Sequence, residues 1–257
     1  MVWLHKRLQQ KLLFNIVKIN KSLYTKAECK ALIAEKRIQK NKKKDLPTQN
    51  LQTLNKLEII TTNKIAFVLG NGTSRKGINL EKLNKFGTIY GCNAIYRDFL
   101  VDYLIAVDVK MVLEINMAGF QNHNKVYTNP NKAYSKMKNL NFFQPSKGWS
   151  SGPTALWLAS THKYEQIYIL GFDYKGLAGG KIINNIYADT RNYKKSTDGA
   201  TFFGNWMRQT RSVLQEFKHI KYTRIIDDTN NFSPRDLEDC KNYNTLHVNF
   251  FKKHFAV

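Results

Sequence analysis

One stretch of the chain combines residue types that can hold a phosphate group. An apolar run over residues 65–69 ends in a turn of glycines, an amide and two hydroxyls: Gly70, Asn71, Gly72, Thr73 and Ser74. Glycines let a backbone turn sharply and approach a bulky ligand, and Arg75 and Lys76 add positive charge. A strand that ends in such a loop commonly binds phosphate in an α/β sheet. The spacing matches neither the dinucleotide fingerprint nor the P-loop, so a tight turn without a ligand is the alternative.

Further polar residues follow the other expected strands. Asn93 lies at the end of a strand expected over residues 88–95, Asp108 ends one over 102–108, and Asp173 ends one over 166–173. Ser151 and Gly152 open a helix that we expect to reach about residue 161, and a helix N-terminus favours anions. Each of these polar side chains could instead cap a turn or a helix. In a parallel sheet they would meet at one edge, which predicts a ligand site there.

The elements that position these residues alternate between strands and helices. Further strands are expected at 125–129 and 221–227, and further helices at 79–85, 110–118, 202–217 and from Ser233 onward. This alternation predicts an α/β, Rossmann-like fold with a mostly parallel sheet and helices on both faces. An insert over residues 174–199 is long for a plain loop and could act as a lid.

The N-terminal part has a different pattern. Residues 1–47 predict a basic amphipathic helical extension, with an apolar stripe at Leu4, Leu8, Leu12, Ile16, Ile19 and Leu23. Residues 48–63 are predicted to be a linker, and residues 64–257 a Rossmann-like nucleotide-binding domain. We expect the extension to pack on its own domain or on a protein partner such as a second copy. A membrane surface or nucleic acid is the alternative partner.

The charge and the cysteine content of the chain limit which kinds of partner and site it can have. The chain of 257 residues carries 41 Lys and Arg against 19 Asp and Glu, a net charge of +22. Such a charge favours an acidic partner, although a solvated lysine-rich surface would give the same count. Three widely spaced cysteines indicate neither a disulfide framework nor a zinc site. Without a signal-peptide pattern or a long apolar span, a cytoplasmic location is expected, with membrane-peripheral or virion association left open.

Four short motifs together resemble a known family. They are the GNGTS turn, Cys92-Asn93 after the next strand, Ser151-Gly152 at the start of a buried helix, and the ILGFD strand over residues 169–173. In this order they look like bacterial sialyltransferases of glycosyltransferase family 42. The DYLIAVD segment over residues 102–108 is also similar to the archaeal pterin-pyrophosphokinase-like and flagellin-modifying group. The resemblance spans residues 64–228.

The resemblance implies roles for particular residues. The turn from Gly70 to Ser74 would hold a nucleotide's phosphate and ribose, while Asn93, Asp173 and the Ser151-Gly152 pair would contact the nucleotide or its sugar. The sialyltransferases use a CMP-sugar as substrate and need no metal, so neither a cofactor nor a metal is expected. Two positions depart from the family. Its basic residue before the TSG segment is displaced to Lys147, and its histidine base is Asn205, which cannot accept a proton at neutral pH.

Three hypotheses follow. The first is a metal-independent, sialyltransferase-like enzyme that transfers a sugar from a nucleotide-sugar to a glycan or another hydroxyl acceptor, with Asp108, Asn205 and Lys147 as candidate catalytic residues. A replacement base could come from His123 or from Tyr187, Asp189, Arg191 or Tyr193 of the insert. The second is a phosphotransferase whose Asp108 and Asp173 bind Mg²⁺. The third is a non-catalytic structural or assembly protein that uses the basic extension to dock.

Overall fold

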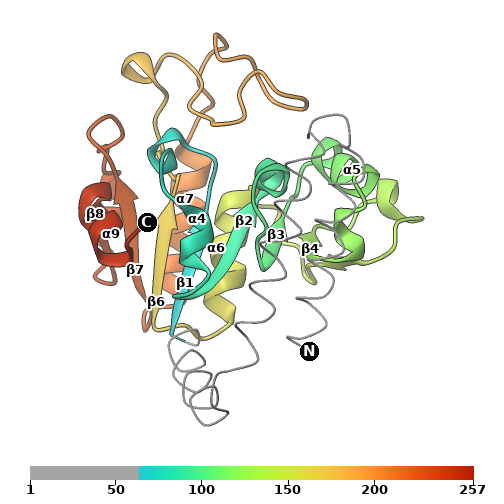
Figure 1. The fold of residues 1–257 in the computed structure, drawn as a ribbon, viewed down its shortest axis with the longest axis horizontal. Coiled ribbons are helices and arrows are strands. Elements are labelled where there is room, and N and C mark those ends of the chain that lie inside the picture. Colours follow the sequence, from blue (N-terminus) through green and yellow to red (C-terminus); the bar gives the residue numbers. More distant parts are fainter. Residues whose placement is uncertain (1–63) are drawn as a thin grey trace, which may run out of the picture. The chain divides into compact units, whose positions relative to one another are not determined.

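The computed structural model describes residues 64–257, and these form an α/β fold around one eight-stranded sheet with the order β5-β4-β3-β2-β1-β6-β7-β8 (Figure 1). Every neighbouring pair of strands is parallel. The strands are β1 Ile65–Leu69, β2 Thr88–Cys92, β3 Tyr103–Ile105, β4 Lys125–Thr128, β5 Leu140–Phe142, β6 Gln166–Leu170, β7 Lys221–Ile226 and β8 Tyr243–His247. The predicted Rossmann-like fold is confirmed. The predicted extension (1–47) and linker (48–63) lie outside the described residues.

Helices cover both faces of the sheet, as predicted. They are α4 Leu80–Leu83, α5 Val109–Met117, α6 Ser151–Thr161, α7 Gly204–Glu216, α8 Arg235–Glu238 and α9 Val248–Phe255. Alternate residues of a strand face opposite sides. Ala66 and Val68 of β1 therefore join the core that includes α6 and α7, while Phe67 and Leu69 join the core that includes α5 and α9. Within residues 64–257, no helix is both long and apolar enough to cross a membrane.

The edges of the sheet differ from the prediction. The short strand β5, the strand β8 and the terminal helix α9 were not predicted, and the helix expected from Ser233 begins at Arg235 as the brief α8. The strands expected over 88–95 and 102–108 are also too long, because β2 ends at Cys92 and passes into a 3-10 helix, Asn93–Arg97. Strands β5 and β8 contain polar or exposed positions. They therefore lack the continuous apolar run that marks the central strands.

The direction of the strand order reverses at β1, which lies between β2 and β6. In open parallel sheets, ligands bind outside the carboxyl ends of the strands at such a point. Here the two strand-end loops touch each other. Gly70 N–H donates to Leu170 O at 2.8 Å, and Gly72 N–H donates to Gly171 O at 2.9 Å. A Cβ on Gly171 would lie 2.7 Å from Gly70 O, and Gly171 has φ +69°. Glycine is therefore required where the loops meet.

The insert between β6 and α7 runs across the carboxyl edge of the sheet (Figure 1, gold to orange). Isolated bridges join Leu177 to Ile182 and Ile182 to Gly199. The insert is attached to the loop after β1, where Ile186 N–H donates to Asn71 O at 2.8 Å. It therefore borders the same edge at which the predicted ligand residues gather.

We predict that Gly171→Ala destabilises the protein more than Gly179→Ala. Both glycines have similar positive φ, +69° and +71°, but nothing lies within 4 Å of a Cβ on Gly179. The left-handed backbone costs an alanine ~1–2 kcal/mol at either position. Overpacking against Gly70 O adds about 1–3 kcal/mol at position 171 alone. Urea unfolding of the two variants measures the difference, and equal losses would contradict the close contact between the loops.

Candidate functional site

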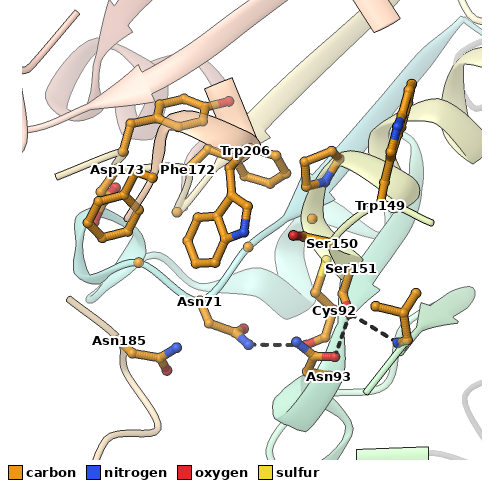
Figure 2. A pocket seen from close by; sticks show the side chains of 18 of the residues that line it. Asn71, Cys92, Asn93, Trp149, Ser150, Ser151, Phe172, Asp173, Asn185 and Trp206 are labelled. Atoms are coloured by element: carbon orange, nitrogen blue, oxygen red, sulfur yellow. Dashed lines mark hydrogen bonds between the residues drawn. The ribbon is translucent and has the colours of Figure 1, made fainter. Parts of the chain in front are cut away.

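A cavity of about 470 Å³ lies at the carboxyl edge of the sheet (Figure 2). It is bounded by the ends of β1, β2 and β6, the start of α6, the start of α7 and part of the insert. Most of the predicted site residues line it: Gly70, Asn71, Gly72, Asn93, Asp108, Ser151, Gly152 and Asp173. Four others do not: Thr73, Ser74, Lys147 and Asn205. The sheet therefore brings the polar strand ends into one cavity.

Asn93 and Ser151 form one polar wall of this cavity. Ser151 Oγ donates to Asn93 Oδ1 at 2.8 Å and accepts from the backbone N–H of Val107 at 3.1 Å (Figure 2). Asn93 has φ +54°, a conformation that asparagine adopts more readily than most residues. Because its oxygen is already bonded, its amide N–H₂ is the group left to donate to a ligand.

Asn71 is held by protein groups on both sides of its amide. Its Nδ2 donates to Tyr193 OH at 3.1 Å and to Cys92 O at 3.3 Å. Its Oδ1 accepts from Arg75 Nη2 at 3.4 Å, and the buried Arg75 also donates through Nε to Gly70 O at 2.6 Å. Asn71 is thus a fixed part of the cavity floor, with the charge of Arg75 behind it.

Thr73 and Ser74 bind other parts of the protein. The backbone N–H and the hydroxyl of Thr73 both donate to Asn184 Oδ1 at 2.9 Å. Ser74 donates through its hydroxyl to Asp173 Oδ1 and through its N–H to Asp173 Oδ2, the latter at 3.1 Å. These groups, which sequence reasoning assigned to a phosphate, instead fasten the loop to the insert and to the end of β6.

The first turn of α6 supplies backbone donors to the cavity. Ser150 is the N-cap and makes no side-chain capping bond, and Thr154 N–H already bonds to Ser150 O at 3.0 Å. Pro153 has no N–H, so the free first-turn donors are those of Ser151 and Gly152. Both residues line the cavity. This end of the helix favours a negatively charged group.

The cavity lining contains no lysine or arginine among the described residues, but two buried guanidinium groups lie behind it. Arg75 is one. Arg224 is 1% exposed, donates through Nη1 to Phe172 O at 3.2 Å and lies 5.4 Å from the ring of Tyr174. Within residues 64–257 neither is paired with a carboxylate. Because low dielectric strengthens a charge's field, both contribute positive potential to the site.

Few lining groups are able to accept a proton. Burial raises the pKa of the Cys92 thiol to about 12 and raises the pKa of Tyr174 strongly. Asp173 is 6% exposed and already bonded by Ser74. Asp108 is exposed and is the N-cap of α5 without a side-chain capping bond. Among the described lining residues, Asp108 is therefore the accessible carboxylate.

The other candidate catalytic residues are outside the cavity lining. Asn205 is exposed and accepts from Arg208, while the next residue of α7, Trp206, lines the cavity. Lys147 pairs with Glu216 at 3.1 Å. The residues His123, Tyr187, Asp189, Arg191 and Tyr193 are also outside the lining. Tyr187 and Tyr193 instead bond to Arg75 and Asn71 beneath the floor.

Sequence reasoning missed the aromatic side of the cavity. Trp149, Phe172, Phe203 and Trp206 line it together with Asn184 and Asn185. The available signal was the grouping of Phe202, Phe203 and Trp206 at the start of a helix. No group of three metal-ligating side chains occurs in the part of the chain that the structure describes.

Comparisons of the chain with protein-family models, with curated proteins and with solved structures find no match.

We predict that the contribution of Asp173 to the free energy of unfolding decreases as pH rises. Burial raises the pKa of Asp173, and the hydrogen bonds from Ser74 only partly offset this effect. A carboxyl whose pKa is higher in the folded state contributes fully below its unfolded pKa and loses that contribution as pH rises through the folded pKa. The free energy of unfolding of the unmodified protein, relative to Asp173→Asn, should therefore decrease as pH rises above about 4, the ordinary pKa of an aspartate.

Asp189→Asn is the control with the opposite sign. Hydrogen bonds from Ser196 lower the pKa of Asp189. Relative to this variant, the stability of the unmodified protein should rise over the acidic range. Parallel slopes for the two variants, measured by urea unfolding across that range, would contradict the assignment of a raised pKa to Asp173.

Proposed function

We propose that the protein is a nucleotide-sugar-dependent, metal-independent glycosyltransferase of a sialyltransferase-like kind. One observation carries the proposal: a single cavity at the reversal point of the sheet contains both the free N–H groups of the α6 N-terminus and the exposed Asp108 carboxylate. The N–H groups suit a phosphate that gains charge as it leaves. The carboxylate suits a base that takes a proton from an attacking hydroxyl.

The proposed reaction is a direct displacement at the anomeric carbon of the donor sugar. The acceptor hydroxyl oxygen forms a bond to that carbon, and the bond between the carbon and the phosphate oxygen breaks. The electron pair of the broken bond stays on the phosphate, beside Ser151 N–H and Gly152 N–H. The hydroxyl proton passes to Asp108. Attack opposite the leaving group inverts the configuration at the anomeric carbon.

The polar wall is assigned to the nucleotide half of the donor. The amide of Asn93 has its N–H₂ left to donate, because Ser151 occupies its oxygen. Half-buried, oriented amides of this kind discriminate between ligands, since a ligand without the matching acceptor leaves a donor unpaired. A CMP-sugar is the specific donor proposed, on the resemblance of the four sequence motifs.

The proposal predicts binding of a cytidine nucleotide that needs no Mg²⁺. A thermal-shift panel of CMP, UDP, GDP, ATP and CMP-sialic acid, with and without Mg²⁺, tests it. A ligand at a hundred times its Kd adds ~2.7 kcal/mol of stability. Asn93→Gly should weaken binding at least tenfold, and glycine tolerates the positive φ at this position. Asn244→Ala, at an exposed site on β8, is the control. The absence of any nucleotide shift would refute the proposal.

A second prediction concerns the base. Asp108→Asn should lower kcat for sugar transfer by about 10²–10⁴-fold, the usual contribution of a positioned base. Its affinity for the nucleotide should stay within about twofold, because the amide is nearly the same size and the phosphate donors are untouched. Asp236→Asn, an exposed carboxylate on α8 outside the cavity, is the matched control. Full activity of Asp108→Asn would remove this residue from the mechanism.

A non-catalytic role is the second candidate, and the position of Asn205 favours it. The residue that matches the family's base is exposed and outside the cavity lining. Nucleotide binding without turnover of any donor sugar would support that role. A shift that appears only with Mg²⁺ would instead support phosphotransfer through Asp108 and Asp173.

A further inference from the structure

Three aromatic residues form a wall of the cavity that the proposed donor contacts leave unused. This aromatic wall consists of Trp149, just before α6, and Phe203 and Trp206, at the start of α7. Figure 2 shows the indole of Trp206 in the middle of the cavity, between Phe172 and Ser150. Phe203 packs edge-on against Trp206 with ring centroids 5.1 Å apart.

The wall is anchored by the two helices from which it projects. The ammonium of Lys147 lies 4.9 Å from the ring of Trp149 and 4.8 Å from that of Trp157 on α6. It also pairs with Glu216 on α7, which accepts from Trp157 Nε1 at 3.1 Å. Gln209, one turn after Trp206, accepts from Ser150 N–H at 3.1 Å. Lys147 therefore holds the ring of Trp149, and Trp206 packs on Phe203 at a helix start that is bonded to Ser150. This order before binding lowers the entropic cost of binding.

The indole N–H groups of the wall are free donors within the described part of the chain. Within residues 64–257, neither Trp149 Nε1 nor Trp206 Nε1 donates to a protein acceptor, whereas Trp157 Nε1 donates to Glu216. Both side chains are half-buried, so their N–H groups are accessible to a ligand in the cavity. Each indole thus presents an apolar face and an N–H donor to the cavity. A ligand with both an apolar surface and an oxygen acceptor matches this arrangement.

We infer that the aromatic wall binds a pyranose ring of the acceptor saccharide. A pyranose has a C–H face that packs on an indole and a rim of hydroxyl oxygens that accept from an indole N–H. The nucleotide is already assigned to Asn93 and the N-terminus of α6, which leaves the aromatic wall for the acceptor. Phe202, next to Phe203 in the chain, is 72% exposed and could contact a longer acceptor. This inference rests on the proposed glycosyltransferase function.

Saturation-transfer NMR on the full chain tests the inference without catalysis. The probes are lactose, maltotriose and chitobiose at millimolar concentration, together with CMP. We expect transfer to the C–H protons of at least one saccharide, with at least a tenfold loss of affinity in Trp206→Ala. Trp206→Phe keeps the apolar face but loses the N–H, so an intermediate loss is expected. Phe250→Ala, at an exposed aromatic residue of α9 outside the cavity lining, should bind as the unmodified protein does.

The nucleotide measurements separate this inference from the proposed function. CMP affinity that changes less than twofold in Trp206→Ala, with saccharide binding lost, supports a sugar subsite. A tenfold loss of CMP affinity in Trp206→Ala, with unchanged saccharide binding, would show that the wall binds the nucleobase and would overturn the inference. So would the absence of any saccharide signal that depends on Trp206. Saccharide binding in a protein that binds no nucleotide would refute the glycosyltransferase but leave the sugar subsite in place.

Discussion

The close contact between the loops after β1 and β6 is the constraint on which the site depends. Gly70 and Gly171 approach each other too closely for a side chain on either. A Cβ on Gly72 would lie 2.4 Å from Asp173 Oδ2. Asp173 is buried beside this contact and accepts two hydrogen bonds from Ser74. The floor of the cavity is thus a rigid joint between two central strands, and the groups above it keep fixed positions.

The hydrogen bonds of this joint limit how the backbone of the glycine-rich turn can bind a ligand. A phosphate loop needs free backbone N–H groups, but those of Gly70, Gly72, Thr73 and Ser74 all have acceptors in the protein. Most of the attraction for an anion must therefore come from elsewhere. The N-terminus of α6 supplies two donors, and the buried Arg75 adds a charge that no described carboxylate neutralises. Burying an unpaired charge is costly, and stabilisation of a bound anion is a physical reason to retain one.

Much of the fold could be predicted from the sequence, because central parallel strands are continuous apolar runs and their polar ends must share an edge. That reasoning placed Asn93, Asp108 and Ser151 in one cavity. It failed at β5 and β8, which border the sheet and carry polar residues. It could not tell which way Thr73 faces, because that depends on Asn184, 111 residues away in the chain. Trp206 was missed because an aromatic residue at a helix start equally indicates ordinary core packing.

The sequence resemblance predicts that Asn205 stands where the sialyltransferases have a histidine base, but the cavity has another group that can accept a proton. A base is defined by its reach and by a free lone pair, not by its position in a motif. Asn205 is outside the lining, while Asp108 reaches the cavity from a different strand end and has no capping bond to break. On the proposed function, Trp206 at the start of α7 would bind the acceptor. Asp108, which follows β3, would take the proton of the acceptor hydroxyl.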